Sequence, residues 1–349
     1  MSPTPTEQDY LAQGQLLLQQ GQFDTAIACF NQALALNGNF APAYYCRGLA
    51  RRNSGDLGGA IQDYTIATQV DAEYALAYYA RGVIYRHLEE YEKAILDYTL
   101  AIDLAPEDPD FYYARGVAHA SRQHYDQAIE DFGEALRRDP LMPNAHYNLG
   151  IAYRDLGQRE PALQHYTLAL QLRPHDADYA YARGNLFSDL NKYAEAVQDY
   201  DRAIQTVPDF ANAFYNRGIA HRNLGKPQKA LEDFNRAVAL GQSFAYLFHN
   251  RGVAHLDLGD HAAAIADFDR ALAMDPHHAN AYYFRGNARV LRHELPQAVA
   301  DYSQALAAKP NFAAAYRARG GALRELGQLE AAAVDLRKFQ QLSQGTDTP

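Results

Sequence analysis

The chain has 349 residues, of which 48% are hydrophobic, and a formal net charge of −10 at pH 7. This composition supplies enough apolar surface for a large core, and the acidic balance disfavours nucleic acid as a partner, because binding to phosphate depends on clustered Lys and Arg. Two cysteines are too few for a disulfide framework, and no secretion signal is visible, so we expect a cytoplasmic protein. No segment approaches the roughly 18 apolar residues of a membrane span, so we expect no membrane insertion.

A glycine recurs every 34 residues along the chain, without an insertion or deletion in the series. The ten glycines are Gly14, Gly48, Gly82, Gly116, Gly150, Gly184, Gly218, Gly252, Gly286 and Gly320. Self-similarity at a fixed period in this range is typical of repeat proteins. We therefore predict a single array at 7–346 between short tails at 1–6 and 347–349. Its repeats, in chain order, are 7–40, 41–74, 75–108, 109–142, 143–176, 177–210, 211–244, 245–278, 279–312 and 313–346.

Each repeat has the pattern of two helices. The first surrounds the glycine, and the second carries an alanine, an aromatic and an alanine at spacings of four and three, as in Ala26, Phe30 and Ala33. These spacings place the three side chains on one helical face. In the last repeat Leu336 and Phe339 replace the aromatic and the final alanine. The small residues allow the two helices of a hairpin to approach closely, and the aromatic fills the space beside them.

Turns and prolines mark the helix ends. Short turns such as Gln20-Gly21-Gln22 separate the two helices of a repeat. Prolines end the second helix in six repeats: Pro106, Pro140, Pro174, Pro208, Pro276 and Pro310. A single hairpin cannot bury its apolar stripe alone, so we expect neighbouring hairpins to stack.

This order of glycine, alanine, aromatic, alanine and proline in 34 residues resembles the tetratricopeptide repeat. The resemblance covers nearly the whole chain. It implies an all-α fold, an α-solenoid that winds as a right-handed superhelix of ten helix-turn-helix hairpins. It also implies that the protein binds proteins or peptides and is not an enzyme.

Eight repeats carry an arginine directly before the glycine and an aspartate directly before the second-helix aromatic. The other two repeats lack both residues, with Gln13 and Cys29 in the first and Leu149 and His165 in the fifth. Pairing within a repeat leaves no charge without a partner, whereas pairing between neighbours leaves several. We therefore predict a structural salt bridge inside each of the eight hairpins. The pairs are Arg47–Asp63, Arg81–Asp97, Arg115–Asp131, Arg183–Asp199, Arg217–Asp233, Arg251–Asp267, Arg285–Asp301 and Arg319–Asp335.

The resemblance implies that the first helices line an inner, concave wall, where ligands meet the residues three before, one after and four after the glycine. The first of these positions is a tyrosine in seven repeats: Tyr45, Tyr79, Tyr113, Tyr147, Tyr181, Tyr215 and Tyr283. The last is an arginine in five: Arg52, Arg86, Arg154, Arg222 and Arg324. Both residue types are enriched in binding hot spots, so a peptide with some acidic character is a candidate partner. The alternative is that the tyrosines pack against neighbouring helices and the arginines pair with nearby acids.

No sequence motif indicates catalysis or a cofactor. The thirteen histidines form no HExxH motif, no CxxC pair occurs, and no glycine-rich loop lies between a strand and a helix. We expect no metal and no cofactor. The Lys and Asn with which some family members clamp a chaperone tail are replaced here, for example by Tyr79 and Val83. The first hypothesis is a protein-binding scaffold or assembly factor, and the alternative is a structural protein that forms homo-oligomers through its terminal repeats.

Overall fold

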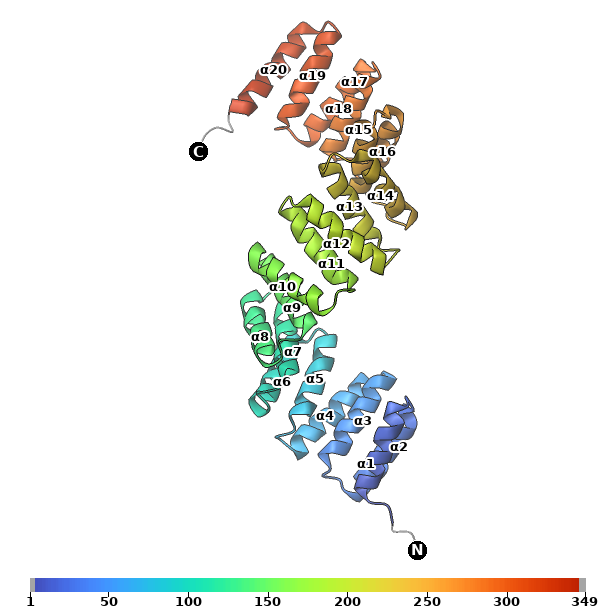
Figure 1. The fold of residues 1–349 in the computed structure, drawn as a ribbon, viewed down its shortest axis with the longest axis vertical. Coiled ribbons are helices and arrows are strands. Elements are labelled where there is room, and N and C mark those ends of the chain that lie inside the picture. Colours follow the sequence, from blue (N-terminus) through green and yellow to red (C-terminus); the bar gives the residue numbers. More distant parts are fainter. Residues whose placement is uncertain (1–3, 345–349) are drawn as a thin grey trace. The chain divides into compact units, whose positions relative to one another are not determined.

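A computed structural model of the protein describes residues 4–344 (Figure 1). Within this range twenty helices follow one another as antiparallel hairpins, and there is no strand. The prediction of an all-α fold made of ten tandem helical hairpins is confirmed. Residues 1–3 of the predicted first tail, 345–346 of the predicted last repeat and the predicted tail at 347–349 lie outside the described residues.

The chain forms two compact units that divide after Pro174. The first holds α1 (Glu7–Gln19), α2 (Phe23–Leu36), α3 (Ala41–Ser54), α4 (Leu57–Val70), α5 (Ala75–His87), α6 (Tyr91–Leu104), α7 (Pro109–Ser121), α8 (Tyr125–Arg138), α9 (Pro143–Asp155) and α10 (Arg159–Leu172). The second holds α11 (Ala177–Asp189), α12 (Tyr193–Thr206), α13 (Ala211–Asn223), α14 (Pro227–Ala239), α15 (Ala245–Asp257), α16 (His261–Met274), α17 (Ala279–Leu291), α18 (Leu295–Ala308), α19 (Ala313–Glu325) and α20 (Leu329–Gln344). The single array at 7–346 stays a prediction.

The repeated glycine makes room for the aromatic ring of the second helix. A Cβ atom built on Gly48 would lie 2.5 Å from the ring of Tyr64, which is a severe clash. Backbones also approach at this point, because a Cβ atom on Gly150 would lie 3.3 Å from the carbonyl oxygen of Ala162. The aromatic ring is therefore the closer neighbour of the glycine, and the alanine brings the backbones together beside it.

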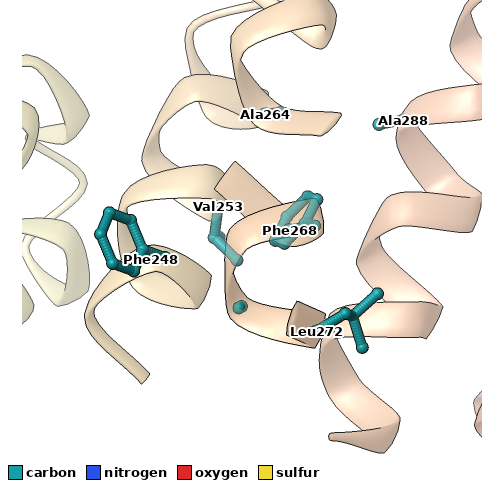
Figure 2. Close-up of a cluster of buried hydrophobic side chains, with 8 residues drawn as sticks. Phe248, Val253, Ala264, Phe268, Leu272 and Ala288 are labelled. Atoms are coloured by element: carbon teal, nitrogen blue, oxygen red, sulfur yellow. The ribbon is translucent and has the colours of Figure 1, made fainter. Parts of the chain in front are cut away.

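Neighbouring repeats bury their apolar faces against each other. Figure 2 shows this between the eighth and ninth repeats, where Phe268 and Leu272 of α16 lie on the side that faces the helix carrying Ala288. Phe268 and Ala288 are completely buried. Each second helix packs against the first helix of its own hairpin and against the first helix of the next hairpin. Its apolar stripe is therefore buried only when hairpins stack.

The turn inside a hairpin requires a residue in the left-handed region of backbone space. Glycine occupies this position in several repeats, as at Gly225 with φ of 67°. Four repeats place another residue there, with φ between 58° and 61°: Glu89, Gln123, Asn191 and His293. A side chain in this conformation costs roughly 1–2 kcal/mol, except that Asn tolerates it better. These turns are therefore strained where the hairpin geometry imposes them.

Candidate functional site

Each of the eight arginines predicted to pair contacts the aspartate of its own hairpin through two nitrogen atoms. In the third repeat, Nε and Nη2 of Arg81 lie 2.8 and 2.7 Å from the two carboxylate oxygens of Asp97. The other seven pairs have the same two-bond contact. All eight aspartates are buried, and the hydrogen bonds that Arg81 donates to Asp97 raise the pKa of Arg81. A bidentate contact to a buried carboxylate is the geometry that a structural role requires.

The remaining guanidinium nitrogen joins neighbouring repeats, a contact that the sequence reasoning missed. Nη1 of Arg81 donates to Oγ1 of Thr65 at 3.0 Å, and Thr65 belongs to the second helix of the preceding repeat. The same contact joins Arg47 to Asn31, Arg115 to Thr99, Arg217 to Asp201, Arg251 to Asn235, Arg285 to Asp269 and Arg319 to Ser303. The sequence signal was the polar residue that stands sixteen positions before each of them. One arginine therefore joins two hairpins.

The same guanidinium groups stack on an aromatic ring of their own helix. Arg217 lies 5.2 Å from the ring centre of Phe214, three residues earlier, and six other repeats have the equivalent contact. In the sixth repeat this earlier position is Ala180, and Arg183 lies instead 5.6 Å from the ring centre of Phe187. The flat guanidinium is thus held by a ring as well as by a carboxylate.

In the fifth repeat His165 takes the place of the aspartate and bonds to His146, which stands where most other repeats have the aromatic ring of the first helix. Nδ1 of His146 lies 3.1 Å from Nδ1 of His165, and Nε2 of His146 lies 3.3 Å from the carbonyl oxygen of Pro140. Because that carbonyl can only accept, His146 donates from Nε2 and accepts from His165 at Nδ1. Burial, and next the proximity of His146, lower the pKa of His165 to about 4.

The first helices form the inner wall of each unit. In the first unit α1, α3, α5, α7 and α9 contact one another in succession, and in the second unit α11, α13, α15, α17 and α19 do the same. Consecutive second helices make no comparable contact among the described residues. Since the first helices lie closer together than the second helices, they occupy the inner side of each stack.

The seven predicted tyrosines all lie on this inner wall and are half-buried. Each ring packs against the second-helix aromatic of its own repeat, with ring centres 5.8 to 6.0 Å apart. Several also contact an aromatic that stands directly before the first helix of the next repeat, such as Tyr181 with Phe210 at 4.8 Å. One part of each tyrosine ring is therefore packed against other aromatic rings, and the rest of the ring is accessible on the surface.

Asparagines of the following repeat bind three of the tyrosine hydroxyls, and the sequence reasoning did not single them out. Asn148 donates to Tyr113 at 3.0 Å, Asn216 to Tyr181 at 2.9 Å and Asn250 to Tyr215 at 3.0 Å. Each asparagine stands two residues before the glycine of its repeat, where most other repeats have a small residue. These bonds fix the direction in which the hydroxyl points.

The predicted arginines of the inner wall have different surroundings. Arg154 donates to Asp155, its neighbour in sequence, and Arg222 donates to Oδ1 of Asn250 at 3.0 Å. Arg52 and Arg86 are half-buried in the second and third repeats, and no acidic side chain pairs with either among the described residues. Arg324 of the last repeat is exposed. The inner wall of the first unit therefore carries positive charge at Arg52 and Arg86.

Two hollows open on the inner wall of the second unit. One, of about 240 Å³, is lined by Asn185, Ser188, Asp189, Tyr200, Asn216 and Ile219. The other, of about 440 Å³, lies in the last two repeats, where Gly321 stands at a position that is apolar or an amide in most repeats. Its lining includes Tyr283, Tyr302, Phe339 and Arg317, and the guanidinium of Arg317 lies 5.8 Å from the ring centre of Phe339.

The described residues hold no group of three or more His, Cys, Asp or Glu side chains that could bind a metal ion. Over the same range, every helix is too short or too polar to cross a lipid bilayer.

Sequence profiles of the tetratricopeptide repeat family match most of the chain. The profile described as TPR repeat matches residues 14–53 and 184–225. Of two profiles described as Tetratricopeptide repeat, one matches residues 113–177 and 291–343 and the other matches residues 75–108, 211–244 and 245–278. A search of curated protein sequences gives no match.

Solved structures share the fold at low sequence identity. The Cut9–Hcn1 hetero-tetramer of the APC/C has a TM-score of 0.51 and 16% identity, covering 96% of this chain and 84% of that chain. A tetratricopeptide repeat protein from Parabacteroides merdae has a TM-score of 0.51 and 18% identity, covering 71% of this chain and 98% of that chain. PilF of Pseudomonas aeruginosa has a TM-score of 0.50 and 20% identity, covering 58% and 92%. The profile matches and the shared hairpin fold agree, and the chain belongs to the tetratricopeptide repeat family.

Proposed function

We propose that this protein is a non-enzymatic scaffold or assembly factor that holds a protein or peptide partner on the inner wall of its first helices. The observation that carries this proposal is the row of half-exposed tyrosines, because their rings are held by packing against buried aromatic rings and three of their hydroxyls are fixed by asparagines. A rigid aromatic side chain with a fixed polar group loses little entropy on binding, which favours affinity.

The charge of the inner wall favours an acidic segment in the partner. Arg52 and Arg86 stand on neighbouring repeats of the first unit, whereas the chain as a whole has a net charge of −10. A cationic strip on an acidic molecule attracts an acidic segment to this strip and disfavours binding elsewhere.

Charge-neutral variants of the two arginines test this proposal. We expect Arg52→Gln/Arg86→Gln to capture less of the native partners than the unaltered chain does, as measured by quantitative mass spectrometry after affinity capture from the native cell. The matched control is Arg137→Gln/Arg159→Gln, which removes the same charge from exposed positions of second helices. Equal capture by both variants would exclude the cationic strip as the binding surface.

A second candidate function is self-association through the terminal repeats, in the absence of another partner. The observation that favours it is the exposure of apolar side chains on α20, where Leu329 is 65% and Val334 is 57% exposed. Sedimentation velocity over a concentration series separates the two functions, since a scaffold that acts as a monomer keeps one sedimentation coefficient throughout.

A further inference from the structure

The smaller hollow of the second unit is walled by two asparagines from neighbouring first helices. Asn185 of α11 stands directly after the repeated glycine, and Asn216 of α13 stands two residues before the next one. This combination occurs once in the chain: Asn287 also follows a glycine, but the next repeat has Ala318 at the second position. Asn148 and Asn250 lack a counterpart, because the preceding repeats have Val117 and Ile219.

Hydrogen bonds within the wall occupy one half of each amide. Oδ1 of Asn185 accepts from the Tyr200 hydroxyl at 2.9 Å and from Nδ2 of Asn216 at 2.8 Å. Nδ2 of Asn216 also donates to the Tyr181 hydroxyl at 2.9 Å. Burial raises the pKa of Tyr200, so its hydroxyl is protonated and serves as a donor. Since an amide oxygen accepts two bonds and an amide nitrogen donates two, both of these atoms are saturated.

The other half of each amide remains unused. Nδ2 of Asn185 has two N–H donors, and Oδ1 of Asn216 has two acceptor sites, and the structure gives neither atom a hydrogen-bond partner among the described residues. The carboxylate of Asp189, one turn further along α11, lines the same hollow and is exposed. The hollow thus offers a donor on one side and acceptors on the other.

We propose that this hollow, lined by Asn185, Asn216 and Asp189, binds the side-chain carboxamide of a Gln or Asn in the partner polypeptide. The carboxamide oxygen accepts from Nδ2 of Asn185, and its NH₂ group donates to Oδ1 of Asn216 and to Asp189. A volume of about 240 Å³ holds the end of a glutamine side chain. This inference rests on the proposed function, because it assigns one contact of a partner that lies on the inner wall.

The same groups reject the charged side chains of similar size. A glutamate would place its carboxylate against that of Asp189 and leave Oδ1 of Asn216 without a donor. A lysine could donate to Asp189 and to Oδ1 of Asn216, but its ammonium group accepts no hydrogen bond and would leave Nδ2 of Asn185 without an acceptor. An unpaired polar group in such a contact costs about 1–3 kcal/mol, so discrimination of at least about tenfold is expected.

Short peptides of the form acetyl-Ala-X-Ala-N-methylamide, with X as Gln, Glu, Lys or Met, test the proposal on the full-length chain labelled with ¹⁵N-asparagine. We expect the Gln peptide to shift the side-chain amide signals of Asn185 and Asn216 at millimolar concentration, with at least about tenfold weaker responses to the other three. Equal responses to all four peptides would show that the hollow contacts the main chain, and would overturn the proposal. No response to any peptide would overturn it as well.

Asn185→Val/Tyr200→Phe is the decisive variant, since the fourth repeat has Val117 and Phe132 at these two positions and packs normally. The matched control is Asn287→Val/Tyr302→Phe, which makes the same change outside this hollow. We expect the preference for Gln to disappear only in the first variant while both keep their melting temperatures. Loss of preference in both variants, or in neither, would contradict the assignment. The two proposals can fail separately. If the peptides show no preference for Gln, but capture of the partner still falls in Arg52→Gln/Arg86→Gln, this inference is refuted and the proposed function is not.

Discussion

Removing Arg217 alone is expected to destabilise the seventh repeat more than removing it together with Asp233. The side chain of Asp233 is 6% exposed and that of Arg217 is 19% exposed, so Arg217→Ala leaves a carboxylate buried without its counter-ion. Breaking such a pair costs about 3–5 kcal/mol, and the partial exposure of Arg217 favours the lower end. In Arg217→Ala/Asp233→Ala no buried charge loses its partner, because Asp201 is 44% exposed, and a loss of about 1–2 kcal/mol remains from the missing contacts.

Hydrogen exchange measured by mass spectrometry on peptides from α13 and α14 reports this difference locally, which matters because a repeat array need not unfold as a single unit. A cost of about 3 kcal/mol corresponds to roughly 100-fold faster exchange in Arg217→Ala. Asp233→Ala is expected to fall between the wild type and Arg217→Ala, since the freed guanidinium can turn toward solvent. Equal or slower exchange in Arg217→Ala than in the double variant would refute the pairing as a source of stability.

Three further predictions concern single positions. The pKa of His165 is lowered to about 4, below its ordinary value near 6.5, so the folded state binds fewer protons than the unfolded state between these pH values. The stability of α9 and α10 is therefore expected to fall as the pH drops from about 6.5 to about 4, as measured by melting curves across this range. Gly218→Ala is expected to destabilise the fold by about 1–3 kcal/mol, because the added Cβ atom would lie 2.7 Å from a ring atom of Phe234. In Gly133→Ala the added Cβ atom meets no atom within 4 Å, so this variant is expected to be more stable by roughly 0.5–1 kcal/mol. Chemical denaturation measures the free energy of unfolding of both variants. His293→Gly is expected to stabilise by about 1 kcal/mol, since φ is 60° there, and an unchanged or lower melting temperature would contradict the strain.

The features that repeat within one hairpin could be predicted from the sequence. The glycine period gives the hairpins, and the spacing of alanine and aromatic residues gives the buried face of the second helix. The Arg–Asp pairs follow from the two repeats that lack both partners, Gln13 with Cys29 and Leu149 with His165.

The contacts between repeats could not be predicted in this way. The third nitrogen of Arg81 reaches Thr65, and Asn216 reaches Tyr181, only because neighbouring hairpins stack with a definite offset. Sequence spacing fixes which residues share a helical face, but it does not fix which residue of the next helix lies opposite. For the same reason the sequence left open whether the tyrosines pack or bind, and the structure shows rings that pack on one side and remain accessible on the other.

Site-specific photo-crosslinking in the native cell tests the central claim most directly. A photoreactive phenylalanine analogue would replace Tyr147 on the inner wall in one variant and Gln198, which is exposed on a second helix, in another. The account predicts a discrete crosslinked partner band from position 147 and none from position 198. Crosslinks from position 198 with none from position 147 would contradict the claim that the first helices form the binding surface.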